Sequence, residues 1–560
     1  MTAAGPLPRR SSPSGGAAPV NVRRRTLLGA AATLPFAACT HEEPVAYTGG
    51  WVGADAARGH RLRDTKSGAL PTPGTQRRAS VLVVGAGVSG LAAARTLMQR
   101  GVDDVHVLDL EDVAGGNSRG HAIAGMACPL GAHYLPVPGD RSTEVIELLE
   151  AFGLRRTEGG QAVYDERHLC HSPQERLNVG GHWFEGLLPP IDALPADRRA
   201  STLAQYRQFA ALVERAGAHG AFSMPTARSA WSPQLDALDA IAFAPWLDAQ
   251  GLDAPALRWY LDYCCRDDYG AGATQVSAWA GLHYFASRHG FHAPGEGAPE
   301  RDGVLTWPEG NAWLSRRLAE PLRERLHAGQ IVLRVTEERG AVSVDTWNAR
   351  EQRAERWTAA HVVLAVPLFV AARVMVAPLA ALAQAAAMMQ HAPWLVGNLH
   401  LAEALDDRPG APPSWDNVVY DPAVALPTLG YVDAMHQSTR SIPGPTVLTT
   451  YWALGGNTPA QLHQQRTRLL AEPWSAWAKA IVQDLARVHP DLPRKLRQVD
   501  LMRYGHAMSI PVPGLRGSAA LRVLAAPQRR VHFAHTDLSA YSVFEEAMYQ
   551  GVRAGVAAAR

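Results

Sequence analysis

One stretch decides the fold of this chain: Val81-Leu-Val-Val-Gly-Ala-Gly-Val-Ser-Gly90, an apolar run that breaks into a Gly-x-Gly-x-x-Gly turn. A helix-like stretch follows as far as Arg100. In such a strand–turn–helix unit the glycines permit a tight turn and close approach of a pyrophosphate, and the free N–H groups at the helix start can bind it. The pattern predicts the beginning of a Rossmann-like α/β domain that binds a dinucleotide.

The residues that follow extend this pattern. A second strand, Val105 to Asp109, ends in a carboxylate. An acidic residue about 20 positions after the glycines binds a ribose hydroxyl and favours an adenosine without a 2′-phosphate. At the other end of the chain, Val531-His-Phe-Ala-His-Thr-Asp537 reads as a strand and a turn, followed by a helix from Phe544 to Ala559. We expect the two ends to form one domain.

The composition is that of a globular protein with room for more than one hydrophobic core, since 47% of its 560 residues are hydrophobic. The 54 basic and 52 acidic residues nearly cancel, which leaves a net charge of +2. We therefore expect no nucleic-acid partner and no acidic tail. Lysine occurs only at Lys66, Lys479 and Lys495, which limits the lysines available for chemistry.

The five cysteines lack the spacing of a zinc site or of a dense disulfide framework, so no metal is expected. The adjacent Cys264 and Cys265 are predicted to be packed core thiols rather than a vicinal disulfide. Cys128 and Cys170 could pair in an oxidising compartment, and the sequence leaves this open.

The amino terminus has the layout of an export signal. Residues 1–22 are rich in Pro, Ser, Gly and Ala, and Arg23-Arg24-Arg25 precedes an apolar run that ends at Cys39. Paired arginines at this place are typical of a twin-arginine signal, so we expect residues 1–39 to direct export to the periplasm by the twin-arginine machinery. Phe36-Ala-Ala-Cys39 also resembles a lipoprotein cleavage box, which leaves a lipid anchor on Cys39 open. The alternative is a disordered basic leader with a chance apolar run; no other stretch is long enough to span a membrane.

After a polar linker expected at residues 40–78, helix-like and strand-like stretches alternate. The expected helices are Ser142 to Phe152, Ser201 to Ala218, Ala254 to Asp262 and Ala312 to His327. The expected strands are Gln330 to Val335, Ala341 to Trp347 and Val362 to Pro367. Residues 375–500 mix both, with Tyr451 and Trp452 as the conspicuous aromatics.

Together these pieces resemble the flavin-containing amine oxidase family, which includes monoamine and polyamine oxidases and, more distantly, phytoene desaturases and protoporphyrinogen oxidase. The resemblance spans residues 79–560 and rests on the glycine turn with Asp109, the Gly115-Gly116 loop, the strand at Val335, Leu364-Ala-Val-Pro367, Phe533 to Asp537 and Glu545 to Ala554. It implies an FAD-dependent oxidoreductase that acts on a small-molecule substrate. The FAD would be held non-covalently, because no cysteine follows Cys265 to form a flavin thioether.

The resemblance also implies a Rossmann-like FAD domain built from discontinuous segments and interleaved with an α+β substrate domain. We expect the FAD domain to comprise residues 79–140, 304–374 and 506–560. The substrate domain would comprise residues 141–303, which look mostly helical, and residues 375–505.

Carried over position by position, the resemblance assigns residues to the cofactor. Those expected at the pyrophosphate, at the ribose and along the first loops are Gly85, Gly87, Ser89, Gly90, Asp109, Gly116, Ser118 and Arg119. Arg119 lies two residues beyond the place where the family usually has an arginine. Val335 would contact the adenine side through its backbone, and Asp537 the ribityl–phosphate region. The helix start at Val543 and Phe544 would direct its dipole at the flavin pyrimidine edge, where it stabilises the negative charge of reduced flavin.

Two departures from the family pattern bear on the substrate. No lysine occurs in Trp394-Leu-Val-Gly-Asn-Leu-His400, where family members commonly place one near the flavin N5. Phe544 stands where the closing motif commonly has a tyrosine. The expected reaction is hydride transfer from a C–N bond of an amine to the flavin, with oxygen or a quinone-linked partner as the electron acceptor.

Two alternatives to amine oxidation stay open. One is a desaturase or isomerase that acts on C–C bonds of an apolar substrate, and the other is a non-catalytic flavoprotein partner. An acidic pocket with an aromatic cage would favour the amine, whereas an apolar, uncharged tunnel would favour the C–C chemistry.

Three residues are candidates for chemistry. His133 and Tyr134 lie in Gly131-Ala-His-Tyr134, where the family brings a loop against the flavin, and histidine can act as a base near neutral pH. The alternative for His133 is a hydrogen-bonded structural histidine. His506 is a further candidate for lining the pocket.

Four other polar or aromatic residues are considered for the site, and all but Trp307 have an alternative role. Asp267 and Asp268 either hold a cationic substrate or, as the favoured reading, pair with Arg266 at the surface. Trp307 and Asn311 are placed at the mouth of the site, with helix capping as the plainer role of Asn311.

Overall fold

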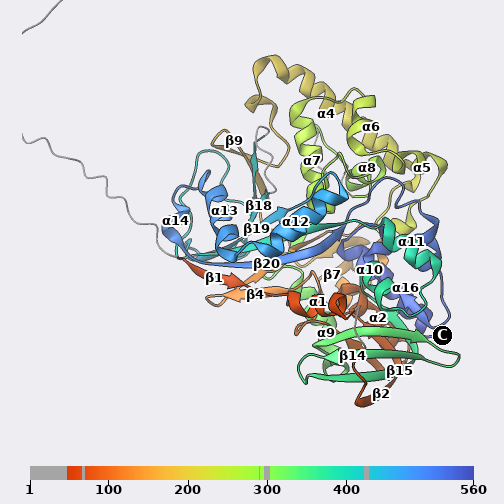
Figure 1. Ribbon diagram of the computed structural model, residues 1–560. Coiled ribbons are helices and arrows are strands. Elements are labelled where there is room, and N and C mark those ends of the chain that lie inside the picture. Colours follow the sequence, from red (N-terminus) through yellow and green to blue (C-terminus); the bar gives the residue numbers. More distant parts are fainter. Residues whose placement is uncertain (1–46, 66–69, 289, 295–302, 422–427) are drawn as a thin grey trace, which may run out of the picture. The chain divides into compact units, whose positions relative to one another are not determined.

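The computed structural model describes residues 47–65, 70–288, 290–294, 303–421 and 428–560. Two large sheets, of seven and eight strands, organise these residues (Figure 1). The seven-stranded sheet takes its strands from residues 75–108, 326–364 and 531–533, and the eight-stranded sheet from residues 48–51, 175–185, 391–453 and 496–509. Segments far apart in the sequence are therefore interleaved in space.

The seven-stranded sheet contains the predicted dinucleotide motif. Its parallel part has the order β12-β3-β2-β15-β21, and β14 and β13 extend it in antiparallel fashion from β15. The strands are β2 (Thr75–Val84), β3 (Val105–Leu108), β12 (Leu326–His327), β13 (Gln330–Glu337), β14 (Val342–Asn348), β15 (Arg353–Leu364) and β21 (Val531–Phe533).

Both faces of the parallel part are covered, which explains why its strands read as unbroken apolar runs. Val81 and Val83 pack against α2 (Val88–Gln99) and α16 (Phe544–Ala558). Leu82 and Val84 point to the opposite face and pack against α10 (Leu368–Val374), α11 (Ala380–Met388) and α15 (Ala519–Ala525).

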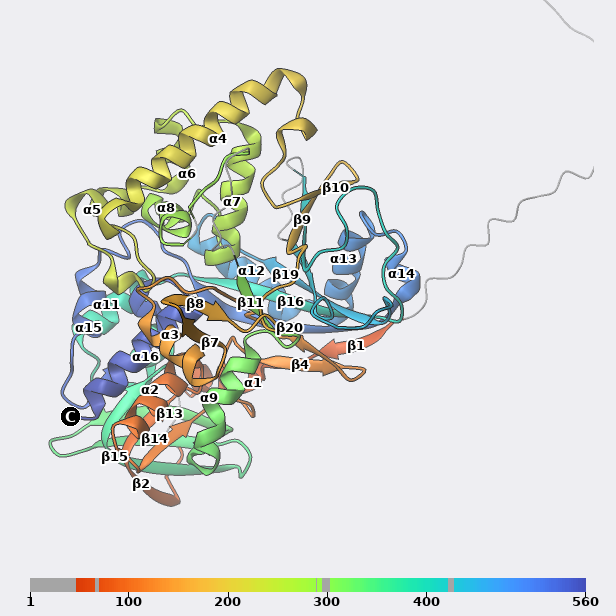
Figure 2. The same cartoon turned by 180° about the vertical axis from the view of Figure 1, so that it is seen from behind.

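The two ends of the chain meet on one face of this sheet, as predicted. Helices α2 and α16 lie side by side in Figures 1 and 2. A Cβ at Gly551 of α16 would lie 2.2 Å from the Ser89 carbonyl oxygen, so glycine is needed for this close approach. The Ser89 hydroxyl donates a hydrogen bond to the Ala534 carbonyl, which joins the start of α2 to the end of β21.

The eight-stranded sheet has the order β1-β20-β16-β19-β18-β17-β9-β10. Its strands are β1 (Thr48–Trp51), β9 (Glu175–Val179), β10 (His182–Glu185), β16 (His391–Leu401), β17 (Asp416–Tyr420), β18 (Thr428–Asp433), β19 (Thr446–Ala453) and β20 (Leu496–Ser509). One face, with Trp452, packs against α13 (Trp474–Ala486). The other face, with Tyr451, packs with the helical segment at residues 196–286.

The remaining elements complete the two layers. The helical segment comprises α4 (Ala196–Gly217), α5 (Pro233–Asp239), α6 (Phe243–Ala249), α7 (Pro255–Tyr269) and α8 (Ala278–Ala286). Other helices are α1 (Ala56–Asp64), α3 (Thr143–Ala151), α9 (Ala312–Ala319), α12 (Pro459–Ala471) and α14 (Leu492–Lys495). Two-stranded sheets form from β4 (Gly120–Ile123) with β5 (Met126–Pro129), β6 (Tyr134–Pro136) with β11 (Val304–Thr306), and β7 (Arg155–Glu158) with β8 (Gln161–Tyr164).

The α/β fold class is confirmed, but three predicted segments differ. The stretch expected as a linker, residues 40–78, contains β1, α1 and the start of β2. The helix predicted from Ala312 to His327 ends at Ala319, because Pro321 lacks an N–H and cannot continue an α-helix. Helix α7 continues to Tyr269 and ends at Gly270, which adopts a left-handed conformation.

The predicted leader, residues 1–39 with Cys39, lies outside the described residues. Among the helices that the structure does describe, none has both the length and the apolar character needed to cross a bilayer. The four described cysteines are free, so Cys128 and Cys170 do not pair here, and Cys264 and Cys265 are buried thiols as predicted. The boundaries of the FAD and substrate domains stay predictions.

Candidate functional site

The glycine turn lies at the carboxyl end of β2, the edge at which open parallel sheets bind ligands. Gly85 has a φ of +101°, and a Cβ there would lie 2.5 Å from the Ala365 carbonyl oxygen, so no other residue fits. Gly87 is the N-cap of α2. The nearest atom to a Cβ built on Gly87 is 3.8 Å away, so this side of the turn is open. An open backbone cradle at a helix N-terminus fits a pyrophosphate.

Asp109 is held against this turn. Its Oδ2 accepts a hydrogen bond from the Ala86 N–H at 2.6 Å, and its Oδ1 accepts one from the Glu111 N–H at 2.8 Å. Burial raises the pKa of Asp109. A carboxylate offers about four acceptor positions, so two remain for ribose hydroxyls. The placement fits the predicted role.

The loop with the glycine pair lies beside the turn. The Gly115 N–H donates to the Ala86 carbonyl over 2.8 Å. Arg119 is 7% exposed, and its Nε donates to the Gly116 carbonyl over 2.9 Å. Ser118 is buried, and its carbonyl accepts from the Ser315 hydroxyl over 2.6 Å. The structure therefore shows Arg119 and Ser118 supporting the loop, and their contact with a cofactor stays a prediction.

Asp537 is fully buried in a polar network. Its Oδ1 accepts from His391 Nε2 and from the Ser509 hydroxyl, each over 3.0 Å. Its Oδ2 accepts from the Leu368 N–H over 2.8 Å. Burial alone would raise the pKa of Asp537, but the neighbouring histidines, His535 and His391, hold it well below its ordinary value. The residue joins β16, β20 and α10, and its predicted contact with the ribityl region is untested.

Three further residues were predicted to contact the cofactor, namely Val335, Val543 and Phe544, and their contact with it stays a prediction. The Val335 carbonyl accepts from the Val376 N–H over 3.0 Å, beside the antiparallel strands. Val543 is the N-cap of α16 and makes no side-chain capping bond, and the helix starts at Phe544 as predicted. The first N–H groups of α16 are therefore not satisfied by a capping side chain, and their dipole favours negative charge.

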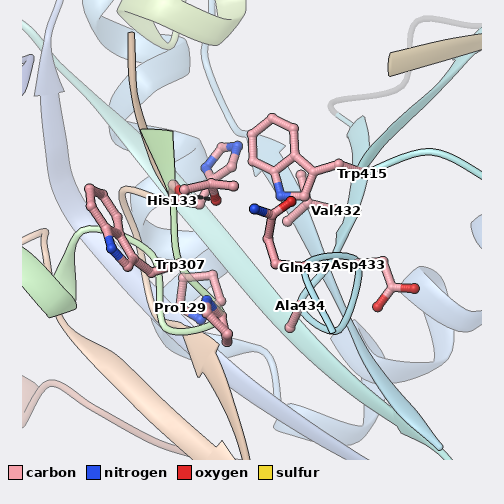
Figure 3. Close-up of a pocket in the computed structure, with 10 residues that line it drawn as sticks. Pro129, His133, Trp307, Trp415, Val432, Asp433, Ala434 and Gln437 are labelled. Carbon is pink, nitrogen blue, oxygen red and sulfur yellow. Dashed lines mark hydrogen bonds between the residues drawn. The ribbon is translucent and has the colours of Figure 1, made fainter. Parts of the chain in front are cut away.

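An aromatic cage lies beside β19 of the eight-stranded sheet, and we define it as His133, Tyr134, Trp415 and Tyr451. The His133 ring stacks on Tyr451 with 4.3 Å between centroids, and it lies 5.4 Å from Trp415 and 4.9 Å from Tyr134. Figure 3 shows His133, Trp307 and Trp415 around a small pocket. Trp307 lines the same pocket as His133 and Trp415, and its place at the mouth of a substrate site stays a prediction.

Side chains from distant elements hold the backbone of the cage. The Thr306 hydroxyl donates to the His133 carbonyl over 3.0 Å, and Asn311 Nδ2 donates to the Tyr134 carbonyl over 2.8 Å. The Tyr451 hydroxyl donates to the Gly131 carbonyl over 3.1 Å. Asn311 precedes α9 but makes no side-chain capping bond, so the capping role expected for it is wrong.

Two acidic residues of α7 point away from the surface partner expected for them. Asp267 Oδ2 accepts from the Tyr134 hydroxyl over 3.4 Å. Asp268 forms an ion pair of 2.9 Å with Arg288 and also accepts from the Tyr541 hydroxyl. Arg266 instead pairs with Asp262, one helical turn away, at 3.0 Å. The favoured expectation of surface pairing with Arg266 is therefore wrong.

Two carboxyl groups without an ion-pair partner among the described residues lie near the cage. Neither Asp267 nor Asp416 forms an ion pair within the described part of the chain. Burial, together with the neighbouring Asp268, raises the pKa of Asp267 to about 7. Burial and the nearby Glu175 and Asp267 raise the pKa of Asp416 well above its ordinary value. A cation placed between these carboxylates would offset an otherwise unfavourable arrangement.

The predicted catalytic residues are only partly brought together. Burial lowers the pKa of His133 to about 3, so its ring is neutral at physiological pH. Burial also lowers the pKa of His506 to about 4, and the ring contacts of His506 are with Phe369 and His391 rather than with the cage. The roles of His133, Tyr134 and His506 in chemistry stay predictions.

Sequence reasoning missed several residues of the site. Trp415 and Asp416 lie at the start of β17 and had no motif to mark them. Tyr451 and Trp452 were equally conspicuous in the sequence, but adjacent strand residues face opposite sides and only Tyr451 reaches the cage. Of the two described lysines, Lys495 is buried against Asp406 and Asp491, and Lys479 is exposed on α13.

The family model described as flavin containing amine oxidoreductase matches residues 88–559. The chain belongs to this family. Family membership implies FAD, and the protein is an FAD-dependent oxidoreductase of the amine-oxidase type.

Individual relatives share short stretches of sequence and the whole fold. Polyamine oxidase 6 of Oryza sativa subsp. japonica is 29% identical over 100 residues, which are 17% of this chain and 20% of the relative. The matches to the three curated relatives cover at most 23% of their own length. Cyclohexylamine oxidase from Brevibacterium oxydans IH-35A superposes with a TM-score of 0.60 at 20% identity, covering 86% of this chain and 98% of its own. A fatty acid isomerase from P. acnes gives 0.59 at 15% identity, with 85% and 97% covered. At such low identity these two structures share the fold alone.

Proposed function

We propose that this protein oxidises a cationic amine, with hydride transfer from a C–N bond to the flavin. One observation carries the proposal: two half-buried carboxyl groups, Asp267 and Asp416, lie at the aromatic cage without an ion-pair partner among the described residues. Buried charges are unfavourable unless they are paired. An ammonium group would pair with them, and the faces of Tyr134, Trp415 and Tyr451 attract cations.

The residues divide the work as follows. FAD, when bound, supplies the hydride acceptor. Asp267 binds the ammonium group and takes its proton at a carboxylate oxygen, because hydride loss requires the neutral amine. Tyr134 holds Asp267 in place through its hydroxyl. The rings of His133 and Tyr451 exclude water from the reacting carbon.

The presence of a second carboxylate favours a substrate with two cationic nitrogens. Asp416 belongs to β17 and Asp267 to α7. Burial raises the pKa values of Tyr134 and Tyr451, and the nearby Asp267 and Asp416 raise them further. Arg288, a cation nearby, is already paired with Asp268. A diamine would therefore meet one carboxylate at each end.

The alternative of C–C chemistry on an apolar substrate has the shared fold of the fatty acid isomerase in its favour. The charge of the site disfavours it, because an apolar chain would leave both carboxylates desolvated and unpaired. A non-catalytic flavoprotein would have no use for these carboxylates.

Anaerobic mixing of the FAD-loaded protein with substrates tests the proposal. Linear diamines should bleach the flavin absorbance, monoamines of equal length should do so less efficiently, and fatty acids or polyenes should have no effect. Readmission of oxygen or of a quinone then identifies the acceptor. Conversion of a lipid by a protein that no amine reduces would refute the proposal in favour of C–C chemistry, and no reaction with either class would favour the non-catalytic flavoprotein.

We also propose export by the twin-arginine route to the periplasm, with Cys39 as a possible site of lipidation. The paired arginines and the apolar run before Cys39 support this proposal. Replacement of Arg24 and Arg25 by lysine should retain the protein in the cytoplasmic fraction, and periplasmic recovery of that variant would contradict it.

A further inference from the structure

The segment expected to be a linker forms a structured band across the two sheets. Strand β1 pairs in parallel with Gln498 to Leu501 of β20, at the edge of the eight-stranded sheet. The Val52 N–H continues this pairing with a bond of 2.9 Å to the Leu501 carbonyl. The chain then turns, and Asp55 caps α1 by accepting from the Ala57 N–H over 2.9 Å.

Helix α1 is tied to the other sheet. Arg58 Nη2 forms an ion pair of 2.9 Å with Asp112, and its Nη1 donates to the Leu110 carbonyl over 3.3 Å. The Arg61 guanidinium lies 4.0 Å from the ring centroid of Trp347 in β14. Arg373 of α10 donates to the Leu62 carbonyl over 3.2 Å. Figures 1 and 2 show α1 between β20 and the seven-stranded sheet.

The contacts of Asp55 and Arg58 both reach the loop that follows Asp109. The Asp55 N–H donates to Glu111 Oε2 over 3.2 Å, and the Glu111 N–H in turn bonds to Asp109. Asp109 is also bonded to Ala86 in the glycine turn. A two-bond relay therefore joins the N-cap of α1 to the carboxylate predicted to bind the adenosine ribose.

We infer that Thr48–Asp64 forms a clasp over the adenosine end of the cofactor site and slows the release of FAD. The inference rests on the FAD of the family and not on the amine chemistry. Opening this end of the site requires either the pairing of β1 with β20 or the ties of α1 to Leu110, Glu111 and Asp112 to break.

The strengths of the two ties indicate which one opens. The pairing of β1 is a backbone ladder, whereas the carboxylate of Asp112 is 50% exposed in its ion pair with Arg58. Exposed ion pairs are weak and are screened by salt. We therefore expect the α1 end of the clasp to open first, and the rate of FAD release to rise with ionic strength.

Flavin release from the holoenzyme tests the clasp. The free-flavin fluorescence that appears after dilution should rise about two- to fivefold faster in Arg58→Ala than in the wild type, the size of effect expected from loss of a partly exposed ion pair. The salt dependence of release should also be smaller in this variant. Arg63→Ala is the matched control, because the Arg63 side chain lies on the same helix, is 67% exposed and, among the described residues, forms its ion pair with Asp64 alone.

Hydrogen–deuterium exchange of the wild type gives a second readout that needs no variant. FAD should slow exchange in residues 56–64 and leave that of α12, an external helix on the other sheet, unchanged. Equal release rates in Arg58→Ala, Arg63→Ala and wild type would overturn the inference, as would exchange in α1 that is insensitive to FAD. If Arg58→Ala lowers the thermal midpoint but does not speed FAD release, Arg58 only stabilises the fold, and this result would also overturn the inference.

Discussion

Replacement of Asp267 by asparagine should raise the stability of the protein at pH 8 and lower its activity on amines. The side chain keeps its shape and can still accept from the Tyr134 hydroxyl, but it can no longer ionise. Burial and Asp268 raise the pKa of Asp267 to about 7, whereas an unfolded chain ionises this group near its ordinary value of 3.8. The change therefore removes a charge that the folded state disfavours.

The direction in which the unfolding free energy changes with pH follows from proton linkage. Between about pH 4 and pH 7 the folded state holds a proton on Asp267 that the unfolded state has lost, so wild-type stability falls across this window. A shift of roughly 3 pKa units at about 1.36 kcal/mol each would amount to about 4 kcal/mol for a group out of contact with water. Because Asp267 keeps some accessible surface, we expect Asp267→Asn to be about 2 to 3 kcal/mol more stable than wild type at pH 8 and about equal at pH 4.

Activity should change in the opposite direction. Loss of the anionic partner of a bound ammonium in a largely buried site costs about 3 to 5 kcal/mol, which corresponds to roughly a 150- to 5,000-fold lower kcat/KM for amines. The wild-type kcat/KM should also rise with pH through about 7, as Asp267 ionises, and this limb should disappear in the variant.

Urea unfolding of the FAD-free protein at pH 4 and pH 8, with anaerobic flavin reduction by amines across the same range, measures both effects. Asp248→Asn is the matched control, since Asp248 is 71% exposed in its ion pair with Arg258. An Asp267→Asn protein that is less stable than wild type at pH 8, or that oxidises amines at the wild-type rate, would refute the assignment of Asp267 as a buried ammonium-binding carboxylate.

Four further predictions follow from the same contacts. Gly85→Ala should yield a colourless protein, because a Cβ at this position would lie 2.5 Å from a backbone oxygen. Gly59→Ala is the control and should stay yellow, because no atom lies within 4 Å of the added Cβ. Retained flavin absorbance in Gly85→Ala would contradict the role of the glycine turn in binding the cofactor. Asp416→Asn should lower kcat/KM at least about tenfold more for diamines than for monoamines, by analogy with buried charge pairs, and equal losses in steady-state assays would exclude a second cationic site. Asp537→Ala should destabilise the protein by about 3 to 5 kcal/mol at pH 7, because it breaks a buried hydrogen-bond network. Since the pKa of Asp537 is lowered, this difference in unfolding free energy should persist down to about pH 4 and become smaller only when urea unfolding is measured at lower pH. In His133→Phe, kcat/KM should still rise with pH near 7, because the His133 pKa is about 3. Loss of this pH dependence in the variant would assign the titrating group to His133 rather than to Asp267.

The parts of the site that could be predicted from sequence are those set by local geometry. The glycine turn has a φ of +101° at Gly85 and an open backbone at Gly87. Glycine at these two neighbouring positions permits both features, so they can be recognised in a few contiguous residues. Asp109 follows at the end of the adjacent strand and bonds directly to the turn. The start of α16 at Phe544 was likewise visible in the local pattern.

The parts that were wrong or missed depend on partners far away in the sequence. Whether Arg266 or Tyr134 faces Asp267 depends on the rotation of α7 about its axis, and packing against the sheets sets that rotation. Strand β1 gains its hydrogen bonds only when β20, some 450 residues later, is in place, so its polar sequence resembled a linker.

The amino-acid sequence alone determined the α/β class, the flavin family and the geometry of the glycine turn, because each of these depends on contiguous residues whose backbone requirements are local. Only the tertiary structure decided where the unpaired carboxyl groups Asp267 and Asp416 lie, which aromatic rings are near them and which loop α1 contacts. These features arise where surfaces of separate elements meet, and burial, which shifts the pKa values of Asp267 and Asp416, exists only after the chain has folded.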